Sequence, residues 1–296
     1  MPHVYKALTI AGTDPSGGAG IQADLKTFQQ LHVYGMSVIT AVVSQNTLGV
    51  RTFLDMPLPL IEDQLDAVFE DIRPEAIKTG MLSQIAVIQL LAHKIKQYDV
   101  AHYVMDPVMV AKSGDALLAE NARDALVQHL LPLTAVVTPN IPEAEVITGR
   151  RVVSIEGMKD AAKYIVEVCG ATSALVKGGH LAGEARDIFY DGHTFSEFAS
   201  PRVATKHTHG TGCTLSAAIT AELAKGASPH QAIETAKAFI TAAIASPLAI
   251  GHGQGPVNHW AYSEQQNERQ NEPREERQVA RSRKEQPATG RGVPNA

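Results

Sequence analysis

Short apolar runs alternate with amphipathic stretches along most of this 296-residue chain, and the alternation restricts the folds that it can adopt. The runs typical of buried strands are residues 5–10, 37–43, 76–79, 103–105, 135–138 and 173–177. Helical spacing of apolar residues predicts helices over 21–31, 60–72, 84–97, 116–130, 154–169 and 213–225. Strands that alternate with helices pair in parallel and are covered on both faces. We therefore expect an α/β fold with a doubly wound, mostly parallel central sheet.

The chain divides into a body and a tail of different composition. Residues 1–262 show no internal repeat and no linker, which favours a single domain. From Ser263 to Ala296 apolar residues almost vanish, so this segment cannot bury enough apolar surface to offset the entropy of ordering it. We expect residues 263–296 to form a charged, disordered tail. A short charged helix over 273–284 is the alternative.

Composition and charge argue against several classes of protein. The formal net charge is -5 and basic residues do not cluster, which disfavours nucleic acid or an anionic membrane as partner. The N-terminus lacks the build of a signal peptide, and the longest apolar stretch, 238–250, is too short to span a bilayer. Two cysteines are too few for a disulfide framework. We expect a cytoplasmic enzyme with a small-molecule substrate.

Polar and glycine-rich residues follow the expected strands at the point where each strand ends. The carboxyl ends of parallel strands share one edge of a sheet, and ligands bind in the crevice there. Each segment alone is a weak signal, but together they predict a ligand site at this edge. The segments are 12–20, 44–47, 78–81, 106–109, 138–143, 177–180 and 208–213.

Two glycine-rich turns open helices, one over 17–20 and the other over 210–212. Small residues let backbone N–H groups converge on a ligand, and a helix N-terminus favours an anion. Either turn taken alone is also explained as a tight turn without a ligand. Neither turn is a Walker A loop, and the first is not a dinucleotide fingerprint, so a phosphate site here needs another design.

Asp106, Asn140 and Glu143 are candidate oxygen ligands for Mg²⁺, which takes few direct protein ligands. A helix cap would explain Asn140 equally well, and an exposed helix charge would explain Glu143. Lys177 ends an expected strand and could neutralise charge on a transferring phosphoryl group, or be a solvated surface lysine.

Cys213 lies at an expected helix N-terminus, where the pKa of a thiol is most readily lowered. The alternative is a small buried residue at a helix start. Cys169, late in an amphipathic helix, is expected in the core. His207 and His209 could suggest a metal site, but two histidines with no third ligand nearby are only weak support for zinc.

Six segments together resemble the motifs of bacterial hydroxymethylpyrimidine/phosphomethylpyrimidine kinases of thiamine biosynthesis. They are KALTIAGTDPSGGAGIQAD (6–24), QNTLG (45–49), KTGML (78–82), DPVM (106–109), HTHGTGC (207–213) and GPVNH (255–259). The likeness extends in order from about Tyr5 to Trp260, so only the charged tail lies outside it. It implies a ribokinase-like fold, a group whose members bind ATP without a Walker A loop, and a homodimer.

The resemblance implies two ATP-dependent steps, phosphorylation of a hydroxymethyl group and addition of a second phosphate. Asn140 and Glu143 would hold Mg²⁺ largely through water, Asp106 would help to neutralise the metal and phosphates, and Lys177 would contact the ATP phosphates. The anion hole over the transferring γ-phosphoryl group would be formed by Gly210, Thr211, Gly212 and Cys213.

The resemblance also implies where the pyrimidine lies. Gln45 would orient the ring through its paired donor and acceptor groups. Met81 and Val108 would supply apolar walls, and Gly12 and Asp24 would lie close by.

Cys213 occupies the position at which most ribokinase-like enzymes carry a general-base Asp, and the pyrimidine-kinase branch commonly has Cys there. A thiolate with a lowered pKa is a weak base towards an alcohol. Phosphoryl transfer depends mainly on positioning and charge stabilisation. We therefore expect Cys213 to assist and orient, while the anion hole, Mg²⁺ and Lys177 supply most of the barrier reduction.

Three alternatives remain at the level of sequence. A pyridoxal kinase of the same branch is the nearest, although residues 45–47 favour the pyrimidine because pyridoxal-specialised relatives tend to differ there. A thiol-based sensor that kept the fold would not need Asp106, Asn140, Glu143 and Lys177. A dehydrogenase would need the dinucleotide fingerprint and a ribose-binding acid.

Overall fold

The computed structural model describes residues 3–109, 120–179, 181 and 183–271. Within these residues nine strands form one sheet, in the order β3-β2-β1-β4-β5-β6-β7-β8-β9. In this order the strands from β2 to β7 pair in parallel, whereas β3, β8 and β9 pair antiparallel. The strands are β1 (Lys6–Gly12), β2 (Tyr34–Asn46), β3 (Gly49–Asp55), β4 (Ala76–Thr79), β5 (Tyr103–Met105), β6 (Val136–Val137), β7 (Ala174–Lys177), β8 (Ala185–Tyr190) and β9 (Phe195–Ser200).

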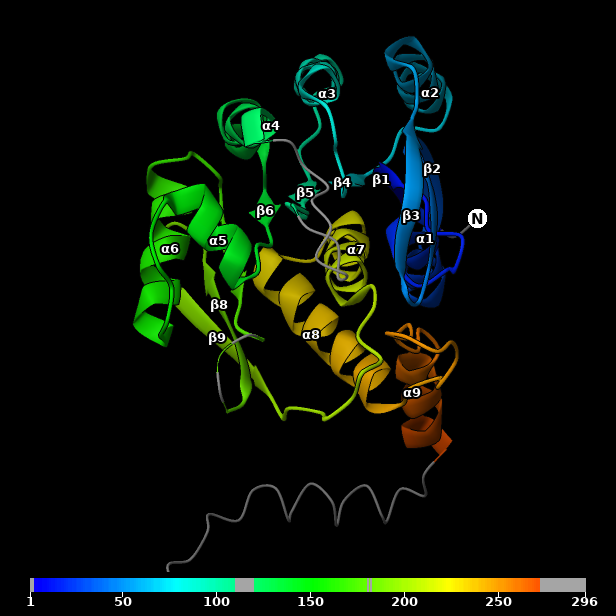
Figure 1. Cartoon of the computed structure of the whole chain (residues 1–296), viewed down its shortest axis with the longest axis vertical. Helices are drawn as coiled ribbons and strands as arrows, with labels where there is room; N and C mark the ends of the chain where they lie inside the picture. Colours follow the sequence, from blue (N-terminus) through cyan, green and yellow to red (C-terminus); the bar gives the residue numbers. More distant parts are fainter. Residues whose placement is uncertain (1–2, 110–119, 180, 182, 272–296) are drawn as a thin grey trace, which may run out of the picture.

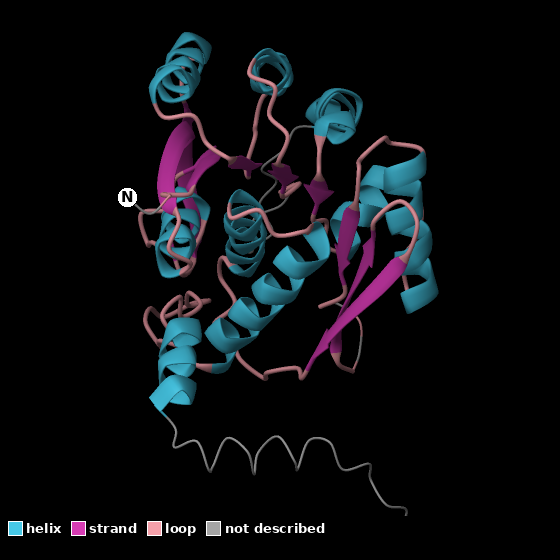
Figure 2. Cartoon of the chain, turned by 180° about the vertical axis from the view of Figure 1, so that it is seen from behind, coloured by secondary structure: helices cyan, strands magenta, loops and turns pink. Residues whose placement is uncertain are grey.

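Helices cover both faces of this sheet (Figure 1). On one face lie α2 (Leu58–Asp71), α3 (Ile85–Gln97), α4 (Glu120–Ala125), α5 (Ile141–Thr148) and α6 (Ile155–Glu167). On the other lie α1 (Gly20–Gln30), α7 (Thr211–Ala224) and α8 (Pro229–Ala245), with α9 (Ala261–Asn271) packed against α8. Figure 2 shows the same arrangement from behind. The expected doubly wound, mostly parallel fold is therefore confirmed.

Each layer of helices encloses its own hydrophobic core against the sheet. The first core holds Ile61 and Leu65 of α2 together with Leu91 of α3. The second holds Phe28 of α1 and Phe239 of α8 around the small side chains of α7. Among the helices of the described ranges, none has the length and apolarity needed to span a bilayer.

α7 lies against the sheet and is flanked by α1 and α8. Its buried side chains are mostly small, including Ala217, Ala218 and Ala221, so its backbone lies close to β1 and β4. The residue before it, Gly210, has φ +79°, a left-handed conformation that suits glycine. This geometry directs the N-terminus of α7 towards the carboxyl ends of the parallel strands.

The strands and helices expected from the apolar pattern are present, but the pattern missed β3, β8, β9, α5, α8 and α9. The helix expected over 116–130 is described only from Glu120, where α4 begins, and it continues as a π-helical turn over Leu126–Leu130. Residues 116–119 lie outside the described residues. Two of the missed strands, β3 and β9, are the edge strands of the sheet, where one-sided exposure weakens the apolar signal, and β8 pairs with β9.

The expectation of a disordered tail from Ser263 is wrong for the first part of that segment. α9 extends to Asn271, and the Tyr262 ring packs on Phe239 with 5.3 Å between ring centroids. Ser263 Oγ donates a hydrogen bond of 2.6 Å to Gln30 Oε1 of α1. The remainder of the tail, including the alternative helix over 273–284, lies outside the described residues.

Candidate active site

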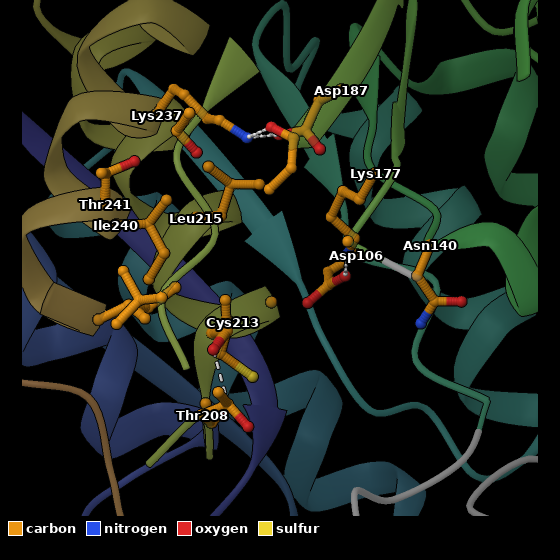
Figure 3. A pocket seen from close by; sticks show the side chains of 18 of the residues that line it. Asp106, Asn140, Lys177, Asp187, Thr208, Cys213, Leu215, Lys237, Ile240 and Thr241 are labelled. Carbon is orange, nitrogen blue, oxygen red and sulfur yellow. Dashed lines mark hydrogen bonds and ion pairs between the residues drawn. The ribbon is translucent and has the colours of Figure 1, made fainter. Parts of the chain in front are cut away.

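A cavity of about 460 Å³ lies where the carboxyl ends of β5, β6 and β7 face the N-terminus of α7 (Figure 3). The other end of the cavity is lined by residues of β8 and α8 and of the segment that follows β9. The turn before α7 and the acidic residues therefore share one cleft, as the sequence predicts. The expected site residues that line it are Asp106, Val108, Asn140, Glu143, Lys177, Gly210, Thr211, Gly212 and Cys213.

Asp106 and Lys177 form an ion pair at the floor of this cavity. Lys177 Nζ lies 3.1 Å from Asp106 Oδ1, and the exposed fractions of the two side chains are 14% and 3%. Burial alone would lower the pKa of Lys177, but the carboxyls of Asp106 and Glu143 outweigh burial and raise it. Lys177 is therefore a buried, protonated cation and not the solvated surface lysine of the alternative interpretation.

Asn140 and Glu143 form a capping box at the start of α5. The Asn140 side chain accepts from the Glu143 backbone N–H at 2.9 Å, and Glu143 Oε2 accepts from the Asn140 backbone N–H at 2.8 Å. Asn140 is thus a helix cap, whereas Glu143 is buried and not an exposed helix charge. Burial raises the pKa of Glu143 to about 7; Lys177 opposes this rise and Asp106 adds to it.

The turn before α7 approaches the ion pair through a glycine. A Cβ at Gly212 would lie 3.3 Å from Asp106 Oδ2 and 3.5 Å from Lys177 Nζ. The first backbone N–H groups of a helix have no partner within it, so the turn presents donors and positive potential to the cavity. The backbone N–H groups of the turn and the Lys177 ammonium therefore face the same part of the cavity.

Cys213 lies at this helix N-terminus, but its pKa is not lowered. Burial raises the pKa of the thiol to about 12; the Lys78 ammonium lowers it, whereas the Asp24 and Asp106 carboxylates raise it further. The expectation of a low-pKa thiolate is therefore wrong. Desolvation of the thiolate exceeds the favourable potential of the helix end. Cys213 is a protonated thiol in this cavity.

The residues expected around the pyrimidine are divided between the cavity and its surroundings. Val108 lines the cavity, but Gly12, Asp24, Gln45 and Met81 are not among its lining residues. Gly12 and Met81 lie together, since a Cβ at Gly12 would be 3.5 Å from the Met81 sulfur. Gln45 lies near the end of β2, where it pairs with Val50 of β3.

Asp24 is enclosed in the interior of the protein. Asp24 Oδ1 lies 2.8 Å from Lys78 Nζ and Oδ2 accepts from Thr9 Oγ1 at 2.6 Å, and neither charged side chain is exposed. Burial by itself would lower the pKa of Lys78, but the Asp24 carboxylate offsets burial and the pKa is raised. The pair lies behind the site and does not reach its surface.

Sequence reasoning missed a second ion pair that lines the cavity. Lys237 Nζ of α8 lies 2.6 Å from Asp187 Oδ2 of β8, and Asp187 Oδ1 accepts from the Gly178 backbone N–H at 3.0 Å (Figure 3). Asp187 lies on an antiparallel strand and Lys237 in the middle of a helix, so neither follows a parallel strand. Apolar residues complete this end, namely Leu215, Pro201, Val203, Ile240 and Ile244.

Comparisons with known proteins agree with the resemblance that the motifs indicate. A family model described as phosphomethylpyrimidine kinase matches residues 14–258. The hydroxymethylpyrimidine/phosphomethylpyrimidine kinase of Haemophilus influenzae is 50% identical over 269 residues, which cover 89% of this chain and 99% of that protein.

Two solved structures extend the likeness to the fold. An ADP complex of Bacillus subtilis pyridoxal kinase has a TM-score of 0.83 at 42% identity, covering 88% of this chain and 99% of that one. The phosphomethylpyrimidine kinase of Clostridium difficile has a TM-score of 0.72 at 45% identity, covering 80% and 98%.

Proposed function

We infer that this chain, which belongs to the phosphomethylpyrimidine kinase family, is an ATP-dependent kinase of thiamine biosynthesis. It phosphorylates 4-amino-5-hydroxymethyl-2-methylpyrimidine to the monophosphate and then adds a second phosphate. The observation that carries this function is the close approach of the α7 turn to the buried pair Asp106–Lys177. A Cβ at Gly212 would lie 3.3 Å from Asp106 Oδ2 and 3.5 Å from Lys177 Nζ. Such a site stabilises charge on a phosphoryl group in transfer.

The cavity has the polarity that a nucleoside triphosphate requires. Its apolar end, around Leu215, Ile240 and Ile244, suits the adenine ring, and its polar end holds Lys177 and the α7 turn. A nucleotide that spans the cavity would place its terminal phosphate at the helix N-terminus. Lys177 and the backbone N–H groups there would stabilise the charge on the equatorial oxygens.

The residues present fit Mg²⁺ bound through few protein ligands. Asp106, Asn140 and Glu143 place oxygen donors at the polar end. Burial raises the pKa of Glu143 and the nearby Asp106 carboxylate raises it further, an unfavourable proximity that a cation would relieve. These three residues would hold the ion. When bound, the ion neutralises phosphate charge and orients the terminal phosphoryl group.

Cys213 would orient the acceptor and not remove its proton. A thiol with a pKa of about 12 is protonated at neutral pH, so it donates or accepts a hydrogen bond but is not a ready base. A loose transition state needs little deprotonation of the alcohol before transfer. Gly12, Gln45, Met81 and Val108 would hold the ring beside Cys213, the roles that the family resemblance implies.

The deciding experiment is an ADP-release assay with hydroxymethylpyrimidine and ATP, followed by product analysis. We expect the monophosphate to appear first and the diphosphate later, and activity to require Mg²⁺. Release of ADP without a phosphorylated pyrimidine would contradict the proposal. Omission of Mg²⁺ and addition of excess chelator serve as the matched controls.

Pyridoxal kinase activity is the second candidate, since the Bacillus subtilis pyridoxal kinase matches this fold with a TM-score of 0.83. Both acceptors carry a hydroxymethyl group on an aromatic nitrogen heterocycle. We expect hydroxymethylpyrimidine to win when both compounds compete at equal concentration, measured as the ratio of kcat/KM. A ratio in favour of pyridoxine would reverse the assignment.

A homodimer and a cytoplasmic location complete the proposal. Leu48, Phe53 and Leu54 of the β2–β3 hairpin are exposed apolar residues, a surface suited to a second copy of the chain. Leu54→Glu should then lower the molar mass measured by light scattering to that of one chain. Cys169 and Cys213 are free thiols, which suits a reducing compartment.

A further inference from the structure

The two glycine-rich turns of the chain interlock at the level of the backbone. A Cβ at Gly210 would lie 1.7 Å from the Gly18 carbonyl oxygen. A Cβ at Gly18 would lie 2.6 Å from His209 Cδ2 and 3.0 Å from Pro256 Cβ. These approaches are too close for a side chain to be inserted without displacement. The turn before α1 and the turn before α7 therefore fit together only because glycine occupies both positions.

Asp14 connects these two turns through its carboxylate. Its Oδ2 accepts from the backbone N–H groups of Gly18 and Ala19 at 3.1 and 2.8 Å and lies 2.8 Å from His209 Nε2. Its Oδ1 accepts from the backbone N–H and the Oγ of Ser16. The Asp14 side chain is not exposed at all, and that of His209 is 13% exposed. The imidazole is thus the group through which the second turn reaches this carboxylate.

His209 is also held through its backbone, by the segment that contains Gly255 and Val257. Its N–H donates to the Gly255 carbonyl at 3.1 Å, and its carbonyl accepts from the Val257 N–H at 3.4 Å. His209 does not line the cavity, whereas Thr208 and Gly210 on either side of it do. Any effect of its side chain on the reaction must therefore pass through the position of these neighbours.

We propose that His209 is a positioning residue for phosphoryl transfer, whose hydrogen bond to Asp14 holds the turn before α7 in register with the adjacent turn at Ala19. The inference rests on the proposed kinase function. Ala19 and Gly210 line the same cavity, so a shift between the two turns changes where the α7 amides point. Displacements of about 1 Å in such a site cost on the order of 100-fold in rate.

The test compares three variants of the full-length enzyme. His209→Leu and His209→Asn remove the contact, the first by removing the donor and the second by shortening the side chain, whereas His209→Gln keeps an amide group near the place of Nε2. We expect His209→Leu and His209→Asn to lower kcat by about 10- to 100-fold with the KM for ATP within about threefold, since Lys177 and the apolar end would still bind the nucleotide. His209→Gln should retain most of the wild-type kcat. His193→Leu, at an exposed position in the β8–β9 turn, is the matched control and should leave kcat unchanged.

The outcomes separate this inference from the function on which it rests. A wild-type enzyme that does not phosphorylate the pyrimidine would overturn the proposed function. A wild-type enzyme that is active, with variants that keep kcat, would overturn only the role of His209. An equal loss in all three variants would also overturn it, because the hydrogen bond would then not matter. If His209→Leu does not fold, the comparison of His209→Asn with His209→Gln decides, with the melting temperature of each variant measured.

Discussion

Lys177 Nζ lies 3.1 Å from Asp106 Oδ1, although 71 residues separate the two in sequence. The contact joins the end of β7 to the residue that follows β5, on the polar side of the cavity. Lys177→Met should lower kcat by about 100- to 1000-fold, because the methionine fills the space but removes the charge that we propose stabilises the transferring phosphoryl group. Steady-state kinetics with saturating ATP and pyrimidine measure this loss.

Lys237→Met is the matched control for that substitution. It removes a cation from the opposite end of the same cavity, where Lys237 pairs with Asp187 at 2.6 Å. We expect it to act mainly on the KM for ATP. An equal fall of kcat in the two variants would show that the two ends of the cavity do not have separate roles.

Because the Cys213 thiol is protonated, we expect this position to tolerate substitution without a large loss of activity. Because its pKa is about 12, its ionisation should not appear in the kcat–pH profile between pH 6 and 9. Cys213→Ser should retain kcat within about tenfold, since the hydroxyl keeps the hydrogen-bonding capacity and transfer does not depend on a strong base. A loss of kcat of more than about 1000-fold in Cys213→Ser would establish Cys213 as the base. So would a pH-dependent change of kcat that is present in the wild type and absent from the variant.

Gly210 and Gly226 offer a matched pair of left-handed glycines at the two ends of α7. At Gly226 φ is +85° and a Cβ would meet nothing within 4 Å, so Gly226→Ala should cost about 1 to 2 kcal/mol through backbone strain alone. At Gly210 the Cβ would also collide with the Gly18 carbonyl, 1.7 Å away. Gly210→Ala should therefore lose more stability in urea unfolding and most of the activity, whereas Gly226→Ala keeps its kcat.

His259 predicts a loss of stability in acid. Burial lowers the pKa of its imidazole from 6.5 to about 4, and its Nε2 lies 3.0 Å from Thr214 Oγ1 of α7. Between pH 6.5 and 4 this imidazole is protonated in the unfolded chain but stays neutral in the folded protein. The free energy of unfolding is therefore highest above pH 6.5 and decreases as the pH falls towards 4.

His259→Gln should remove this dependence. Relative to the variant, the wild type should lose about 2 to 3 kcal/mol of unfolding free energy between pH 7 and 4.5. Urea titrations of both proteins at the two pH values measure these unfolding free energies. The contribution of the carboxylates that titrate in both proteins cancels when the variant is subtracted from the wild type. Parallel curves would show that the imidazole is protonated in the folded protein.

The expectation that ligand sites lie at the carboxyl ends of parallel strands predicted the polar end of the cavity, because its residues occupy such positions. Asp106, Asn140 and Lys177 each follow or end a parallel strand, and the sheet brings such positions together. The same rule could not find Asp187 or Lys237, which reach the cavity from an antiparallel strand and from the side of a helix.

Burial was the quantity that the sequence could not supply. Asp24 and Lys78 belong to conspicuous motifs, but only the packed structure shows that they pair in the interior. For Cys213 the local signal was a helix N-terminus, and desolvation by the surrounding fold reversed its effect on the pKa. The alternation of apolar runs therefore predicted the architecture well, while the ionisation states depended on contacts between distant segments.

The complete enclosure of Lys78 makes its amine a reporter of global opening. With an exposed fraction of 0% and a carboxylate at 2.8 Å, the amine is out of reach of a water-borne acylating reagent while β1, β4 and α1 stay together. Acylation of this lysine would therefore follow the rate at which the centre of the domain separates, and the adduct, detected by mass spectrometry, would time that event without an engineered reporter residue.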